Sequence, residues 1–220
     1  MEIKKRIFGR ISPVQQFIAS FLILILAGSL LLKLPTATVH GISFIDALFT
    51  STSAVCVTGR IVLDTAKDFT FTGQAIILLL IQFGGLGIMT FTIGIFSMFG
   101  GSFSLKWRFA FGEIYNEVAI IPPSQILKKI ILYTATVESV TAVILYSQFI
   151  KKYNITDSIW HSVFHSVSAF CNAGFSTFTD SLISYQSNPV VILSISFNII
   201  LGGIGFIVLT ELVNFKILKK

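Results

Sequence analysis

The chain has 220 residues, of which 54% are hydrophobic and only 12% are charged. A soluble globular chain carries about 25% charged residues, so this composition excludes an ordinary water-facing surface and predicts a membrane protein. Lys and Arg outnumber Asp and Glu by 16 to 10, but the positive charges lie at the ends of apolar segments. They form no clustered patch of the kind that grips nucleic acid. We therefore expect a lipid membrane, and no nucleic acid, as the surroundings of this chain.

Four long stretches with few or no charges predict four transmembrane helices, because a spanning helix needs about 20 mostly apolar residues. The predicted spans are 14–34, 71–98, 126–150 and 189–215. Eleven of the 16 Lys and Arg residues fall on the side that holds both termini and the loop between the second and third spans. By the positive-inside rule, we expect a multi-pass protein of the cell membrane with both termini cytoplasmic.

Two shorter apolar segments, 44–59 and 159–174, lie between these spans and are too short to cross a membrane. A shift of 115 residues superposes them: Phe49 falls on Phe164, Ser51 on Ser166, Ser53 on Ser168, Ala54 on Ala169, Cys56 on Cys171 and Gly59 on Gly174. Each is followed by a glycine cluster, at a shift of 118: Gly84, Gly85 and Gly87, then Gly202, Gly203 and Gly205. The sequence thus predicts an all-α membrane protein of two helix, re-entrant loop, helix repeats, with four transmembrane helices and two pore helices. The predicted boundaries are 1–100 for the first repeat, 101–125 for a cytoplasmic interfacial linker and 126–220 for the second repeat.

The re-entrant loops restrict the function, because non-helical backbone at membrane depth is tolerated only where it is buried in protein or lines a water-filled cavity. The first loop is expected to turn at Val57, Thr58 and Gly59, where glycine permits backbone angles that other residues resist. The carbonyl groups of such a turn can replace the hydration shell of a cation. The short helix that leads into the turn also points its negative C-terminal end at that cation.

At these residues the sequence resembles the Trk/Ktr/HKT superfamily of potassium transporters, most closely the KtrB-type membrane subunit. The signatures are C-V-T-G at 56–59, C-N-A-G-F at 171–175 and I-Q-F-G-G-L-G at 81–87. The resemblance implies potassium transport with possible sodium coupling, no cofactor and no enzymatic activity. It also implies a selectivity filter and pore-lining glycines. The filter residues would be Val57, Thr58, Gly59, Asn172, Ala173 and Gly174, and the pore-lining helix glycines Gly84, Gly85, Gly87, Gly202, Gly203 and Gly205.

The same resemblance implies partners. A subunit of that family has four repeats around one pore and a cytoplasmic nucleotide-binding ring that regulates it, whereas this sequence holds the first two repeats. We expect either a second copy or a separate C-terminal half to complete the ring, and favour the C-terminal half. The alternative function is a truncated or non-conducting assembly subunit of the same family.

Four polar residues leave specific questions open. His161 and His165 lie four apart, and Cys171 follows them, so a metal site is conceivable; we favour an interfacial position for both histidines and expect no metal. Glu138 is an acid inside a predicted span, and a structural tether to the neighbouring pore helix is favoured over a role in transport. Arg60 departs from the family pattern, which is usually apolar after the first filter glycine. We expect it to point away from the ion path and to pair with Asp64 or Asp46.

Overall fold

The computed structural model of the chain describes residues 13–99 and 123–204. Its elements in chain order are α2 (Pro13–Leu32), α3 (Phe44–Val55), α4 (Phe71–Phe99), α6 (Pro123–Phe149), α7 (Ile155–Phe170), a 3-10 turn η1 (Ile183–Tyr185) and α8 (Pro189–Ile204). The described ranges contain no β-strand beyond one isolated bridge between Thr38 and Phe69. The predicted all-α fold is confirmed, and the starts of the four long helices agree with prediction to within three residues. Most of the predicted linker at 101–125, and the fourth span beyond Ile204, lie outside the described residues.

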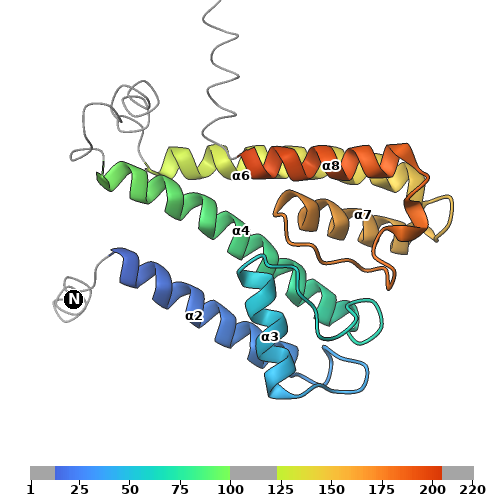
Figure 1. Cartoon of the computed structure of the whole chain (residues 1–220), viewed down its shortest axis with the longest axis horizontal. Coiled ribbons are helices and arrows are strands. Elements are labelled where there is room, and N and C mark those ends of the chain that lie inside the picture. The colour runs from blue at the N-terminus through green and yellow to red at the C-terminus, as the bar shows by residue number, and fades with distance from the viewer. Residues whose placement is uncertain (1–12, 100–122, 205–220) are drawn as a thin grey trace, which may run out of the picture.

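The two short helices lie alongside the long ones, one in each half of the molecule (Figure 1). Helices α6 and α8 run side by side along one edge, α2 lies at the opposite edge, and α4 crosses between them. The short helix α3 packs against α2 and α4, whereas α7 packs against α6 and α8. Helix α4 also contacts α7 and so joins the two halves. The start of α2 and the end of α8 point toward the same end of the molecule, away from the loops that lead into α3 and α7 (Figure 1).

Each short helix begins with the same type of cap. Ser43 Oγ accepts a hydrogen bond from the Asp46 amide at 3.1 Å, and Asn154 Oδ1 accepts one from the Asp157 amide at 2.8 Å. These side chains satisfy one of the amide groups that the first turn of a helix leaves unpaired. The caps are 111 residues apart, whereas the C-terminal ends of the helices superpose at 115. Helix α7 is therefore one helical turn longer at its start, with 16 residues against 12 in α3.

The short helices are fastened to their neighbours by equivalent contacts. Ser51 Oγ donates to the Ile25 carbonyl of α2 at 2.7 Å, and Ser166 Oγ donates to the Glu138 carbonyl of α6 at 2.7 Å. Asn198 of α8 adds a bond from Nδ2 to the Ser166 carbonyl at 2.8 Å. Buried hydroxyl and amide groups are costly unless paired, so these contacts fix the depth at which each short helix sits.

The outer surfaces of the long helices are strongly apolar. Ile23 of α2, Leu132 of α6 and Leu193 of α8 are 67%, 69% and 67% exposed. Among the residues with described side chains, the segment Lys128–Phe149 of α6 is long and apolar enough to cross a membrane. The segments Phe17–Leu32, Phe71–Gly87 and Pro189–Ile204 are apolar but shorter within that description. Such an exposed apolar surface suits contact with lipid.

Candidate functional site

The chain makes the same sharp turn after each short helix. Val57 and Asn172 have φ angles of 55° and 60°, and Gly59 and Gly174 have φ angles of 72° and 71°. Each turn is closed by an amide-to-carbonyl bond back to its helix: Thr58 to Ser53 at 2.9 Å, and Ala173 to Ser168 at 2.8 Å. Both turns thus place a left-handed backbone conformation at the same two positions, and glycine adopts it without the steric cost of a side chain.

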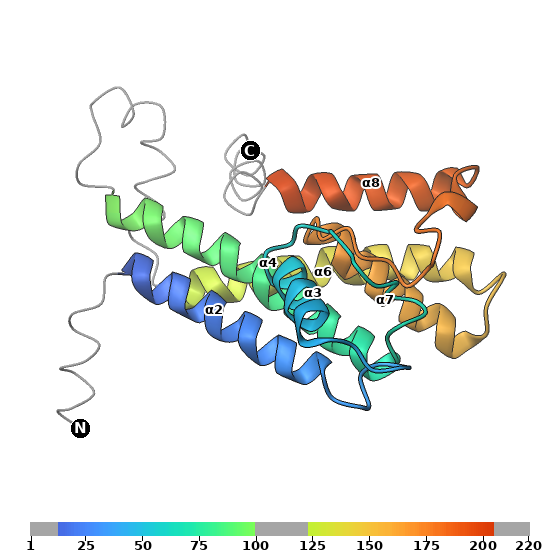
Figure 2. The same ribbon diagram turned by 60° about the horizontal axis from the view of Figure 1, so that its bottom comes forward.

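The two turns lie in direct backbone contact. A β-carbon built on Gly59 would be 2.7 Å from the Ala173 carbonyl oxygen and 3.3 Å from the Gly174 Cα. A β-carbon on Gly174 would be 3.3 Å from the Gly59 Cα. In Figure 2 the segments that follow α3 and α7 approach each other between the two halves of the molecule. Residues 115 positions apart in the sequence therefore form one site.

The carbonyl groups of this site accept no hydrogen bond from the part of the chain that the structure describes. Among the residues that the structure describes, none donates a hydrogen bond to the carbonyl oxygens of 57–59 or 172–174. Thr58, Asn172 and Gly174 are exposed. Each carbonyl oxygen carries two lone pairs that can bind a cation. The helices α3 and α7 lead directly into the two turns, so the negative C-terminal ends of their dipoles lie next to these oxygens. Chemically, such an arrangement of carbonyl oxygens can coordinate a cation.

Different side chains support the two turns. In the first, Thr58 Oγ1 donates to Ser53 Oγ at 2.9 Å. In the second, alanine stands at the position of Thr58, and Ser168 Oγ instead donates to the Phe175 carbonyl at 2.7 Å. The sequence superposes Ser53 on Ser168, but it carries no signal that these two residues anchor the turns.

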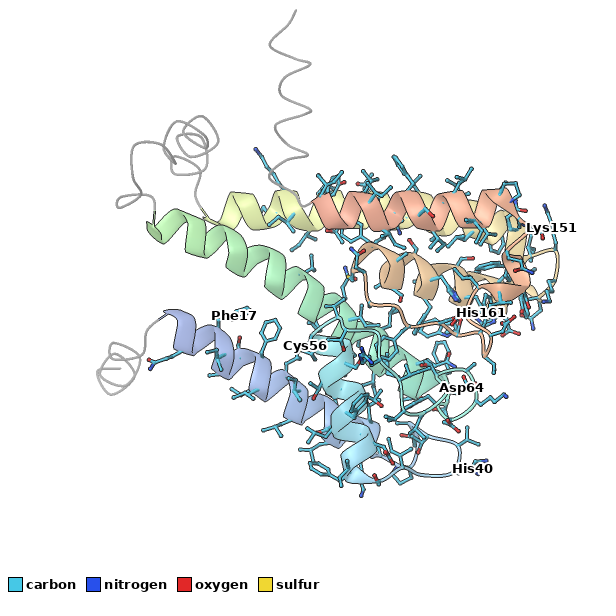
Figure 3. The ribbon with its side chains drawn as sticks, viewed as in Figure 1. Phe17, His40, Cys56, Asp64, Lys151 and His161 are labelled. Atoms are coloured by element: carbon cyan, nitrogen blue, oxygen red, sulfur yellow. The ribbon has the colours of Figure 1, made fainter. Side chains whose placement is uncertain are left out.

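His165 is buried beneath the second turn, with 3% of its surface exposed, so the expected interfacial position is wrong for this residue. Its Nδ1 lies 2.7 Å from the His161 carbonyl oxygen and its Nε2 lies 2.9 Å from Ser176 Oγ. His161 is half-buried and its Nδ1 lies 2.7 Å from Thr177 Oγ1 (Figure 3). The described residues contain no group of three or more His, Cys, Asp or Glu side chains that could hold a metal ion. The segment after Gly174 covers the His165 ring, because Ser176 and Phe178 both contact it.

The side chain of Glu138 is tethered to α4 and not to the short helix α7. Gln82 Nε2 of α4 lies 3.3 Å from Glu138 Oε2, and Gln82 Oε1 lies 3.7 Å from the Cys171 sulfur at the end of α7. The contact of Glu138 with α7 runs through its backbone carbonyl, which Ser166 binds. Within the described residues Glu138 Oε1 is buried without a hydrogen-bond partner. The side chain of Glu138 thus tethers α6 to α4, whereas the prediction placed the tether between α6 and α7, which only the backbone carbonyl of Glu138 reaches.

The glycine clusters bring helix backbones close together. A β-carbon on Gly84 would overlap the Val55 carbonyl oxygen, and one on Gly202 would overlap the Phe170 carbonyl oxygen, so each long helix touches the end of its short helix. Gly85 faces the Cys171 sulfur, at 2.8 Å from a built β-carbon. The remaining described members lie near Phe21 (Gly87, 3.3 Å) and near Asn172 Nδ2 (Gly203, 3.8 Å). Gly205 lies outside the described residues, and a pore-lining role for the clusters stays a prediction.

Comparison with known proteins identifies the family. The sequence model of the TrkH family, described as cation transport proteins, matches residues 11–219. The chain belongs to the TrkH cation transport family. The predicted Trk/Ktr resemblance is thereby confirmed, and membership makes the chain a membrane protein.

Individual TrkH-type relatives agree. The chain is 42% identical over 219 residues to the potassium/sodium uptake protein NtpJ of Enterococcus hirae, covering 99% of this chain and 49% of the relative. It is 41% identical over 205 residues to the Ktr system potassium uptake protein B of Bacillus subtilis, covering 93% and 46%. For the protein of the same name in Vibrio alginolyticus, the identity is 36% over 192 residues, covering 87% and 42%. The chain thus spans about half the length of the curated relatives it matches.

Arg60 is exposed, directly after the first turn of this TrkH family chain. It forms no ion pair with the described residues, so the expected pairing with Asp64 or Asp46 is wrong. Asp64 Oδ1 accepts from the Ala66 amide at 2.8 Å, and Asp46 Oδ2 accepts from Ser43 Oγ at 2.7 Å. Both carboxylates thus satisfy nearby backbone or cap groups, which are closer in sequence than Arg60 and cost less entropy to reach.

Proposed function

We propose that this chain is the pore-forming part of a potassium uptake system, in which the backbone carbonyls of the two turns bind a dehydrated monovalent cation. The observation that carries the proposal is the contact between Gly59 and Gly174 in two turns of the same conformation. The carbonyl oxygens around this contact have no hydrogen-bond donor among the described residues. The names of the relatives, which are potassium uptake proteins, agree with that chemistry.

The cation would be held by neutral dipoles. A potassium ion must shed water to enter a narrow pore, and inward-facing carbonyl oxygens replace the lost water without a fixed counter-charge that would trap the ion. The carbonyls of 57–59 and 172–174 would form two sides of this filter. The first turn has no room for a side chain at position 59, because the backbone of the second turn occupies that space.

Two turns supply only part of a ring. In lipid, each polar backbone group without a partner costs several kcal/mol, so the open side of the site needs a covering protein surface. We expect a C-terminal half with two further repeats to provide it, with a second copy of this chain as the other arrangement. The relatives, about twice as long as this chain, support the first. The name "Ktr system" supports a multi-component assembly, and we expect a cytoplasmic nucleotide-binding ring as its regulatory member.

A second candidate is a non-conducting assembly subunit, which the coverage of about half of each relative favours. Rubidium uptake in a host that lacks its own potassium uptake distinguishes the two. The chain would be expressed alone, with a second tagged copy, and with the C-terminal half of the Bacillus subtilis relative. Saturable rubidium uptake that exceeds that of the C-terminal half alone supports the pore-forming role. Equal uptake with and without this chain, at matched amounts in the membrane, contradicts it. Repeating the assay with and without sodium tests sodium coupling.

The proposed topology places both termini in the cytoplasm and the loops before α3 and α7 outside. A reporter that is active only outside the cell should be silent when fused after Lys220. The same reporter should be active when inserted between Lys151 and Lys152, which are exposed between α6 and α7. An active fusion after Lys220 would contradict the arrangement.

A further inference from the structure

We propose that His165 is a positioning residue for the second turn, which holds the segment after Gly174 through Ser176 and thereby sets cation preference. This inference rests on the proposed function of the turns. His165 lies on the short helix α7, does not touch the exposed carbonyls, and was not among the residues predicted to form the filter. Its two ring nitrogens instead join the helix to the segment that leaves the turn.

The partners of His165 fix the position of its proton. The His161 carbonyl can only accept, so Nδ1 must carry the hydrogen and donate it across the 2.7 Å contact. In the neutral ring Nε2 is then an acceptor, and Ser176 Oγ must donate to it across 2.9 Å. Ser176 Oγ in turn accepts from the Phe178 amide at 3.0 Å. The result is a directed chain of three hydrogen bonds that runs from the Phe178 amide through Ser176 and His165 to the backbone of α7.

The ring is also held in place by its surroundings. The Phe178 ring stacks on the His165 ring at 4.5 Å between centroids, and Phe149 of α6 meets it edge-on at 5.8 Å. Ser168 binds the Phe175 carbonyl from the same helix. The backbone between Ala173 and Ser176 is thus anchored at both ends to α7, so a loss of the His165 contact frees one end of a short segment that contains Gly174.

The first turn lacks this device. By the shift of 115, the residue that corresponds to His165 is Thr50. Its hydroxyl is buried and has no hydrogen-bond partner within the described part of the chain, so it does not reach the segment after Gly59. The two turns therefore have the same backbone shape, but only the second has its outgoing segment anchored by a side chain from this position.

The test uses a matched set of variants in the transporting assembly of this chain with a C-terminal half. His165→Asn keeps a donor near the Nδ1 position and removes the group that Ser176 binds. His165→Gln places an amide near the Nε2 position, and Ser176→Ala removes the same bond from the other side. Thr50→Val is the control at the corresponding position of the first turn. The readout is the ratio of rubidium to sodium uptake, normalised to the amount of protein in the membrane.

We expect His165→Asn and Ser176→Ala each to lower this ratio about threefold to tenfold, in line with the loss of one hydrogen bond. The double variant should fall no further than either single one, because both remove the same contact. His165→Gln should retain the ratio to within about twofold, and Thr50→Val should leave it unchanged. A residue that only supports folding would lower the amount of protein and leave the ratio intact.

Gly174→Ala, measured in parallel, separates the two proposals. If Gly174→Ala lowers the ratio while His165→Asn and Ser176→Ala leave it unchanged, the positioning role is wrong and the proposed function stands. If Gly174→Ala itself leaves the ratio unchanged, the proposed function fails. A loss in His165→Gln as large as that in His165→Asn would also overturn the positioning role, since it would show that the Ser176 contact is not the decisive one.

Discussion

The first and second turns follow the same backbone path but are held by different side chains. Positive φ angles recur at Val57 and Asn172 and again at Gly59 and Gly174, and the closing amide bonds recur as well. The supporting bonds do not recur: a threonine hydroxyl serves the first turn, whereas a serine and a histidine serve the second. A site made of carbonyl oxygens depends on the path of the backbone, so the side chains behind it are free to differ as long as that path is kept.

The first turn also contains a strained position. Val57 is β-branched and has a φ angle of 55°, a region that such residues rarely enter. Asn172, its counterpart, tolerates this region far better, and its Nδ2 lies 3.3 Å from the Phe170 carbonyl oxygen and 3.4 Å from that of Ile199. Strain of this kind costs about 1–3 kcal/mol and persists only when surrounding contacts enforce it. The first turn is thus the more strained of the two.

We expect the largest effect from substitutions that block the close approach of a long helix to a short one, a contact that both halves share. Gly84→Ala and Gly202→Ala each place a methyl group on a backbone carbonyl oxygen at the end of a short helix. Overpacking of this kind costs about 1–3 kcal/mol or more where backbone must move. We expect little monodisperse protein from either variant in detergent size-exclusion chromatography. Gly203→Ala is the control, since its nearest neighbour, Asn172 Nδ2, is at 3.8 Å; an equal loss there would show that the close contact with the short helix is not responsible.

A smaller effect separates the two strained positions. Asn172→Val puts a β-branched residue at φ 60° and removes the amide contacts, so we expect a loss of about 1–3 kcal/mol in the free energy of unfolding. Val57→Asn should be neutral or stabilising by about 1 kcal/mol, because it relieves the same strain. Thermal unfolding midpoints of the purified assembly measure both. Equal losses in the two variants would contradict the assignment of strain to Val57.

We expect a still smaller effect from a substitution that makes the first turn resemble the second. Thr58→Ala places alanine where Ala173 stands in the second repeat and removes the bond to Ser53, which costs about 0.5–1.5 kcal/mol. Ser53→Ala should cost a similar amount, and the double variant should cost little more than either single one. Additive losses, measured by the same unfolding assay, would show that the two hydroxyls act separately.

The smallest effect concerns Arg60, which is exposed and has no ionic partner among the described residues. Two unit charges 4 Å apart interact by about 4 kcal/mol near a protein surface, so an inward guanidinium would strongly repel an entering cation. Because we expect the side chain to point away from the ion path, Arg60→Leu should change rubidium uptake by no more than about twofold. A large gain in uptake at low ionic strength that disappears at high ionic strength would place the charge in the ion path instead.

The sequence was sufficient for the features that depend on backbone and apolar pattern. The long helices, the two short helices, and the turns at Gly59 and Gly174 follow from segment length, the repeat at a shift of 115 and the need for glycine at positive φ. The burial of His165 was not predictable, because the spacing of four residues from His161 is equally compatible with a buried and with an interfacial histidine. Its role depends on Ser176, which is brought to it only by the turn.

The sequence was also insufficient to predict the partners of the charged side chains. Glu138 binds Gln82, 56 residues away, through a side-chain contact between α6 and α4 that no local pattern encodes. Asp46 and Asp64, the expected partners of Arg60, bind groups within three residues of themselves. A hydrogen bond to a nearby residue is favoured over an ion pair with Arg60, because it costs less conformational entropy to form.

The most direct test of the central claim is the cation selectivity of Gly59→Ala and Gly174→Ala in the assembly with a C-terminal half. A β-carbon at Gly59 meets the Ala173 carbonyl oxygen at 2.7 Å, whereas the closest neighbour at Gly174 is the Gly59 Cα at 3.3 Å. Both changes strain a left-handed backbone, and the first also displaces a carbonyl of the other turn. We predict that both lower the ratio of rubidium to sodium uptake, and that Gly59→Ala lowers it more. An unchanged ratio in either variant, at a normal amount in the membrane, would contradict the account.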